Sequence, residues 1–114
     1  MKYGRAVKIS GTGMYVPPKV VTNDDLAQLM DTSDEWIQQR SGIKERRYVD
    51  DGVTPTDIAE KAALAALEKA GLQGSDIDML VVATLSPEHF FPGNSAFLQE
   101  RLGMGIAPAL DVRC

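Results

Sequence analysis

The stretch Asp78-Met79-Leu80-Val81-Val82-Ala83-Thr84 decides the fold class. It is a continuous apolar run of strand length, and segments with helical patterns lie before and after it. In such an alternation of strands and helices, an uninterrupted apolar run indicates a central strand that is covered on both faces of a parallel or mixed sheet. We therefore predict an α/β fold in which a mixed sheet is covered by helices.

The neighbouring segments fit this alternation. Thr54 is suited to cap a long helix, Pro55 to occupy its first position and Gly71 to end it. After the apolar run, residues 85–93 form a loop rich in Pro and aromatic residues. Asn94 or Ser95 then caps a helix through residue 102, and residues 107–112 return as a second buried strand. The sequence thus predicts helix, strand, helix and strand over 54–112.

The first half of the chain has shorter elements. Residues 6–9 have strand character, and Gly11-Thr12-Gly13 marks a turn that leads into an irregular segment. This Gly-x-Gly is no dinucleotide fingerprint, because Val16 stands where a third Gly is required. Two short helices are expected, over 22–30 and 32–40. In the second, Thr32 and Glu35 have the spacing of a capping box, and Gly42 is placed to end it.

Trp36 and Arg40 are the first candidate binding residues. They are four positions apart on the second short helix, so they lie on one helix face. An adenine could stack between the indole and the guanidinium, with Lys44, Arg46 and Arg47 supplying positive charge nearby. The alternative is a capped surface helix whose Trp36 packs into the core, which is the common role of an aromatic residue at helical spacing.

Five blocks in a fixed order resemble the N-terminal part of the ketoacyl-acyl-carrier-protein synthase III family, condensing enzymes of the thiolase superfamily. The blocks are residues 9–17 (ISGTGMYVP), 22–26 (TNDDL), 31–46 (DTSDEWIQQRSGIKER), 81–84 with 89–92 (VVAT and HFFP), and 108–112 (PALDV). A typical member is about three times as long. The resemblance implies that residues 1–114 are the N-terminal portion of the first thiolase-like domain.

The resemblance also implies a function. Members of this family join an acyl-CoA starter to a malonyl thioester by decarboxylative Claisen condensation, in fatty acid or related acyl-chain biosynthesis. A Cys at the start of a buried helix attacks the starter thioester, and a His and an Asn further along the chain assist decarboxylation. The matching nucleophile position is two residues beyond Cys114, and the His and Asn also lie outside this sequence. We therefore expect no catalytic residue here, and an inactive chain if it is alone.

By the same resemblance, Trp36 and Arg40 contact the adenine end of coenzyme A. Phe91 shapes the acyl pocket, with Leu85 and Phe90 as weaker neighbours. Ordinary core or dimer packing is the alternative for this aromatic loop. His89 is the only His, but no Cys, carboxylate or second His stands at a suitable spacing to make it a catalyst or a metal ligand. No metal site and no cofactor are expected, since coenzyme A thioesters are substrates.

Composition and the family together define the expected partners. Net charge is −4, with 44% hydrophobic and 25% charged residues, which argues against nucleic acid. The single Cys permits no internal disulfide, and no signal peptide or membrane-spanning run is recognised, so a cytoplasmic protein is expected. The family implies acyl-CoA, a homodimer and acyl-carrier protein as a further candidate partner. Alternatives are a non-catalytic coenzyme A-binding or assembly module and a fragment that folds only with its complement.

Overall fold

The computed structural model describes residue 4 and residues 6–113. The chain divides into two compact units. One unit comprises residues 16–53, and the other comprises the chain up to Tyr15 together with the chain from Thr54 onward.

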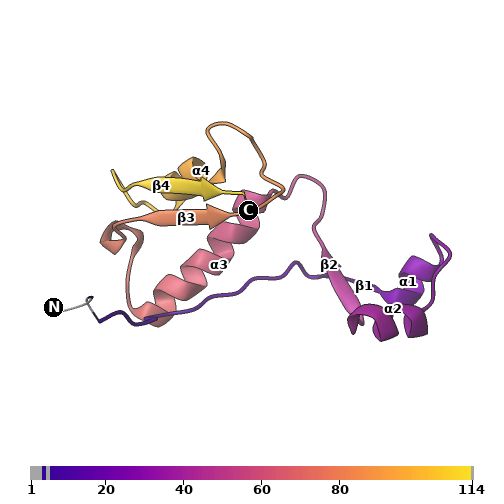
Figure 1. The fold of residues 1–114 in the computed structure, drawn as a ribbon. Helices are drawn as coiled ribbons and strands as arrows, with labels where there is room; N and C mark the ends of the chain where they lie inside the picture. The colour runs from indigo at the N-terminus through magenta and orange to yellow at the C-terminus, as the bar shows by residue number, and fades with distance from the viewer. Residues whose placement is uncertain (1–3, 5, 114) are drawn as a thin grey trace. The chain divides into compact units, whose positions relative to one another are not determined.

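The 16–53 unit is a two-stranded antiparallel sheet with two short helices between its strands (Figure 1). Its elements are β1 (Lys19–Thr22), α1 (Asn23–Ala27), α2 (Asp34–Ser41) and β2 (Glu45–Tyr48). The strands pair so that Lys19 faces Tyr48 and Thr22 faces Glu45. Thr22 forms a capping box with Asp25 at the start of α1. Both short helices were predicted, whereas the strand pair was not.

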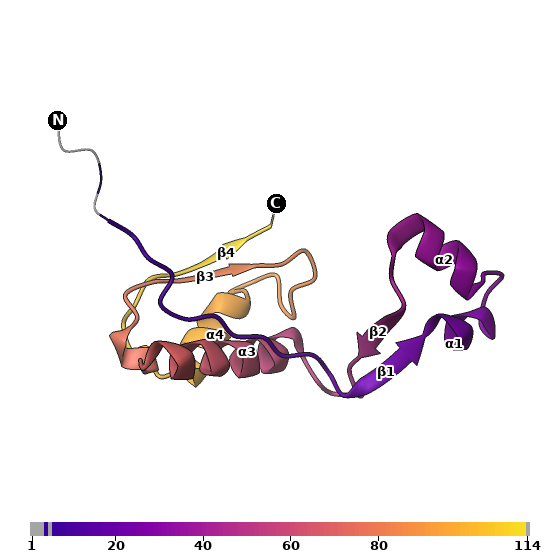
Figure 2. The same cartoon turned by 90° about the horizontal axis from the view of Figure 1, so that it is seen from below.

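The other unit contains the predicted α/β alternation. Its elements are α3 (Pro55–Ala70), a 3₁₀ turn (Gly74–Asp76), β3 (Leu80–Ala83), α4 (Asn94–Arg101) and β4 (Ala109–Val112). β3 and β4 are parallel, with Leu80 opposite Ala109 and Ala83 opposite Val112. Figure 2 shows α3 and α4 on the same side of the two strands. The α/β class is confirmed, and the parallel pair agrees with the predicted parallel or mixed sheet.

α3 begins and ends where its local signals place it. Thr54 caps the helix in a capping box with Asp57, Pro55 is the first helical residue, and Gly71 ends the helix in the left-handed conformation with φ 67°. Its small residues then allow another segment to approach closely. A Cβ on Gly13 would overlap the carbonyl oxygen of Ala62 and the backbone nitrogen of Ala66. The Gly11-Thr12-Gly13 segment is therefore a backbone contact with α3, where the sequence predicted a turn.

Three further predictions are wrong in detail. Residues 6–9 form no strand, because their backbone makes no ladder with any other described strand. α2 is capped by Ser33, whose hydroxyl accepts from the Trp36 N–H, so the predicted Thr32 cap is incorrect. β3 is covered on one face only by the described helices, and Val81 on its other face is 54% exposed.

Candidate functional site

α2 presents Trp36 and Arg40 together. The Arg40 guanidinium carbon lies 5.7 Å from the centroid of the Trp36 ring, which is within cation–π distance. Trp36 is 56% exposed, so its ring is not packed in the core of the 16–53 unit as that unit stands. An aromatic face with a cation beside it is suited to a flat, electron-rich ring that carries negative charge.

A hollow of about 360 Å³ lies beside this ring, and its lining residues are Asp31, Thr32, Ser33 and Trp36. The Thr32 hydroxyl is buried and finds no hydrogen-bond partner among the described residues. Buried hydroxyls usually have a partner, so an orphaned one calls for an explanation. Sequence reasoning assigned Thr32 to helix capping and missed this feature. The only signal in the sequence was that Thr32 and Ser33 are both suited to cap the same helix, so that one of the two hydroxyls needs another partner.

Asn23 holds α2 in place. Its side chain is 1% exposed and makes three hydrogen bonds. The amide nitrogen donates to Asp34 Oδ1 at 2.7 Å and to the Ile43 carbonyl oxygen at 2.8 Å, and the amide oxygen accepts from Arg46 Nη2 at 2.7 Å. These bonds connect the start of α1 to both ends of α2 and to β2. Hydrogen bonds from the side-chain amides of Asn23 and Gln38 lower the pKa of Asp34.

Two of the three charged side chains predicted near Trp36, Arg46 and Arg47, make hydrogen bonds or ion pairs within the 16–53 unit. Arg46 donates to the side chain of Asn23 and, at 3.4 Å, to the Val21 carbonyl oxygen. Arg47 pairs with Glu45 at 3.0 Å. The partners of Arg46 are neutral oxygens, so it keeps its positive charge, whereas the charge of Arg47 is paired with a carboxylate. That Lys44, Arg46 and Arg47 supply positive charge near a bound ligand stays a prediction. Arg40 is the guanidinium that stands over the Trp36 ring.

Phe91 belongs to the other unit, on the loop between β3 and α4. Its side chain is 91% exposed and that of Phe90 is 78% exposed. Arg113 contacts Phe90 twice: its guanidinium carbon lies 5.2 Å from the ring centroid, and its Nη2 donates to the Phe90 carbonyl oxygen at 3.0 Å. Neither Phe is core packing within its own unit. Their exposure leaves both the acyl-pocket role and a packing role at an interface open to test.

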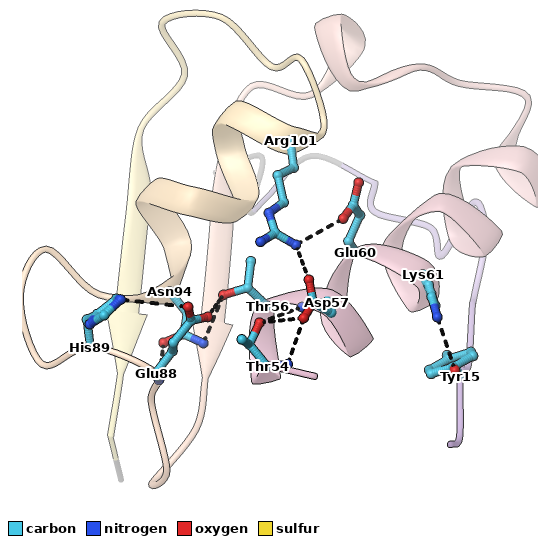
Figure 3. A network of polar contacts seen from close by, with 10 residues as sticks. All are labelled: Tyr15, Thr54, Thr56, Asp57, Glu60, Lys61, Glu88, His89, Asn94 and Arg101. Atoms are coloured by element: carbon cyan, nitrogen blue, oxygen red, sulfur yellow. Dashed lines mark hydrogen bonds and ion pairs between the residues drawn. The ribbon is translucent and has the colours of Figure 1, made fainter. Parts of the chain in front are cut away.

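A polar network lies behind this loop (Figure 3). Thr56 near the start of α3 donates to Glu88 Oε2 at 2.8 Å, and this bond is the main reason that the pKa of Glu88 is lowered. His89 Nε2 lies 3.7 Å from Glu88 Oε1, and the centroids of the His89 and Phe97 rings are 5.3 Å apart. In this structure His89 therefore contacts the side chains of Glu88 and Phe97. Sequence reasoning missed the buried Thr56.

α4 is capped from the following strand. Gly93 precedes the helix and supplies no side chain, and the Asp111 carboxylate accepts from the Ser95 N–H at 3.2 Å and from the Ser95 hydroxyl at 2.5 Å. Gly93 has φ 97°, and a Cβ there would overlap the Asp111 carboxylate. A carboxylate at a helix N-terminus is stabilising. Asp111 thus ties β4 to the start of α4.

The remaining predictions concern Cys114, metal ions and membrane-spanning helices. Cys114, the neighbour of the expected nucleophile position, lies outside the described residues. Over residue 4 and residues 6–113, no group of three or more His, Cys, Asp or Glu side chains is arranged to hold a metal ion. Within the same residues, every helix is too short or too polar to span a bilayer.

Comparison with known proteins gives a consistent result. No family model matches the chain. The β-ketoacyl-(acyl-carrier-protein) synthase III of Hyphomonas neptunium is 47% identical over 110 residues, which are 96% of this chain and 34% of that relative. The crystal structure of 3-oxoacyl-(acyl-carrier-protein) synthase III from Aquifex aeolicus VF5 matches with a TM-score of 0.88 and 42% identity, over 94% of this chain and 34% of that one.

A crystal structure of the priming β-ketosynthase from the R1128 polyketide biosynthetic pathway matches with a TM-score of 0.89 and 31% identity, over 94% of this chain and 32% of that one. The chain thus spans about a third of the length of the relatives it matches. Its α/β fold is the N-terminal part of the thiolase-like fold. By sequence and by structure, the chain belongs to the β-ketoacyl-(acyl-carrier-protein) synthase III family and corresponds to the N-terminal third of its members.

Proposed function

We propose that this chain is the coenzyme A- and acyl-contacting portion of a condensing enzyme. The complete enzyme joins an acyl-CoA starter to a malonyl thioester by decarboxylative Claisen condensation. It is a cytoplasmic homodimer, and acyl-carrier protein is a further candidate partner. The relatives are named as synthases of the acyl-carrier-protein system, and one structural match is a priming ketosynthase of a polyketide pathway. Fatty acid and polyketide starters are therefore both candidate substrates.

The observation that carries the proposal is the exposed Trp36 ring with Arg40 beside it and a hollow at its edge. The adenine of coenzyme A stacks on the indole, and Arg40 faces the base or a neighbouring phosphate. A base inserted between the two side chains pushes the guanidinium outward, which the exposure of Arg40 permits. A turn of the Thr32 side chain brings its unpaired hydroxyl to the hollow, where it binds a polar edge of the base.

The acyl end of the substrate is assigned to Phe91. An exposed aromatic ring on the loop between β3 and α4 can line an apolar pocket once the rest of the enzyme or a second subunit surrounds it. β4 then leads the chain toward the nucleophile, and Asp111 fixes the direction of β4 against α4. In this proposal the chain binds and orients the substrate, and the covalent chemistry belongs to residues that follow Cys114.

Fluorescence tests the adenine contact directly, because Trp36 is the only Trp. Coenzyme A should quench its emission, whereas 4′-phosphopantetheine, which lacks the adenine, should not. Trp36→Ala should weaken coenzyme A binding by about 1–3 kcal/mol, measured by calorimetry. Gln39→Ala, an exposed neighbour on the same helix, is the matched control and should leave the affinity unchanged.

Unchanged affinity in Trp36→Ala, together with no quenching, would remove the adenine role. A separate measurement addresses the activity of the protein as a whole. The intact mass of the protein made from its native gene should be about three times the 12.4 kDa of this chain if it is a complete condensing enzyme. A mass of 12.4 kDa with retained coenzyme A binding would favour a non-catalytic binding module.

A further inference from the structure

The loop from Leu85 to Gly93 carries the exposed pair Phe90 and Phe91 but contains no helix or strand. A loop of this kind normally samples several positions, because few backbone hydrogen bonds fix it. Two exposed aromatic rings on a mobile loop could not define a pocket of one shape. The contacts that hold the middle of this loop therefore bear on what Phe91 can do.

Three buried or half-buried side chains hold it, and we name Thr56, Glu88 and Asn94 the Thr56 clamp (Figure 3). The Thr56 hydroxyl donates to Glu88 Oε2 at 2.8 Å and accepts from Asn94 Nδ2 at 3.4 Å. The Glu88 backbone N–H donates to Asn94 Oδ1 at 3.0 Å. The three bonds form a closed ring, and the Thr56 hydroxyl is used in it both as donor and as acceptor.

Burial makes the clamp rigid. Thr56 is 0% exposed and Asn94 is 2% exposed, so neither side chain can exchange its partner for water without a local opening. Both stand in the first turn of a helix: Thr56 in α3, and Asn94 as the first residue of α4. The loop is therefore anchored to two helices through one residue, Glu88, which lies two positions before Phe90.

The residues next to Glu88 are held as well, but Phe91 is not. His89 packs against Phe97, and Phe90 is held by Arg113 through its ring and its carbonyl oxygen. Phe91 follows these anchored positions with 91% of its side chain exposed. Of the two exposed rings, Phe90 is contacted by Arg113, and Phe91 extends from a backbone whose position is fixed just before it.

We propose that the Thr56 clamp determines acyl-chain selectivity by fixing the loop that presents Phe91, so that Thr56 is a positioning residue for the acyl end of the substrate. This proposal rests on the proposed function, because the acyl contact of Phe91 belongs to it. Thr56 acts without touching the substrate. Loss of the Thr56 hydroxyl leaves the Phe91 side chain itself unchanged, but the loosened loop lets its ring take several positions.

Thr56→Val tests the clamp, because Val keeps the shape of Thr and removes the hydroxyl. Thr56→Ser restores the hydroxyl and is the rescue variant. In the chain, hydrogen exchange of the amides of residues 85–93 should rise about tenfold in Thr56→Val, since two hydrogen bonds are lost, and should stay near wild type in Thr56→Ser. Glu88→Ala removes the same clamp from the loop side and should behave like Thr56→Val even if the Val variant fails to fold.

The control is Ser86→Ala in the same loop, because Ser86 is held to Thr84 through its backbone N–H. In the complete condensing enzyme, the ratio of kcat/KM for a short and a long straight-chain acyl-CoA should shift several-fold in Thr56→Val. The affinity for free coenzyme A, which reports the adenine end, should not change.

Unchanged loop exchange in both Thr56→Val and Glu88→Ala would overturn the clamp. Faster exchange with an unchanged selectivity ratio would overturn its role in selectivity. A complete protein that condenses no acyl-CoA would refute the proposed function and with it the selectivity claim, and the exchange measurement would still decide whether the clamp holds the loop.

Discussion

Replacing Asn23 by Ala tests how the 16–53 unit is held together. Asn23 is 1% exposed, and its amide makes hydrogen bonds of 2.7, 2.8 and 2.7 Å to Asp34, Ile43 and Arg46. At a net contribution of about 1 kcal/mol for each bond, the substitution should lower the free energy of unfolding by about 3 kcal/mol. Hydrophobic burial contributes little to the stability of this unit, because Val21 is the only buried hydrophobic side chain among its described residues.

Urea unfolding followed by Trp fluorescence measures this effect, because Trp36 lies on α2 within the same unit. With a slope of about 1 kcal/mol per molar urea, which is typical of small proteins, the midpoint should fall by about 3 M. Asp24→Ala, at the exposed neighbouring position, is the control and should change stability by less than about 0.5 kcal/mol. A loss below about 1 kcal/mol in Asn23→Ala would refute the view that this amide organises the unit.

Two further perturbations test the other unit. Gly13→Ala should destabilise the chain by about 1–3 kcal/mol in thermal or urea unfolding, because the added Cβ overlaps the backbone of α3, whereas Met14→Ala, 80% exposed, should not; equal stability would show that the segment does not contact α3. The Arg101 hydrogen bond, followed by those of the α3 cap, lowers the pKa of Asp57 from 3.8 to about 2. The stabilisation that the ionised Asp57 carboxylate provides is complete above pH 3.8 and is lost as the pH falls to about 2. Asp57→Asn should therefore be less stable than wild type at neutral pH, and its melting temperature should fall less steeply in acid. Parallel acid transitions in the two proteins would contradict this linkage.

Local signals made the prediction of α3 accurate. Thr54, Pro55 and Gly71 each act within one turn of the helix end, so their effect can be read from neighbouring residues. The α2 cap shows the limit of such signals. Thr32 and Ser33 are both suited to capping, and the choice between them depends on backbone geometry that the sequence does not show.

Contacts between distant residues could not be predicted in this way. The β1 and β2 strands are four residues each, carry several charges and pair across two intervening helices. The Thr56 hydroxyl bonds to a residue 32 positions away. Nothing in the local pattern of Thr56 distinguishes it from any other Thr near a helix start, so the clamp emerged only from the structure.

For the candidate site, spacing alone placed Trp36 and Arg40 on one helix face, and the structure confirms that they contact each other. The roles of Trp36, Arg40 and Phe91 in binding substrate stay predictions. The engagement of Arg46 by Asn23 could not be foreseen, because a guanidinium near a proposed ligand site has the same appearance in a sequence whether it is free or bonded.

The scarcity of buried apolar side chains in the 16–53 unit also has a thermal consequence. Heat capacity rises on unfolding in proportion to the apolar surface that becomes exposed, about 12–15 cal/mol/K per residue in ordinary globular domains. A unit organised by the Asn23 amide and two arginines exposes less of that surface. Its stability curve is correspondingly flat, so cooling weakens it less than it weakens a unit held by a hydrophobic core.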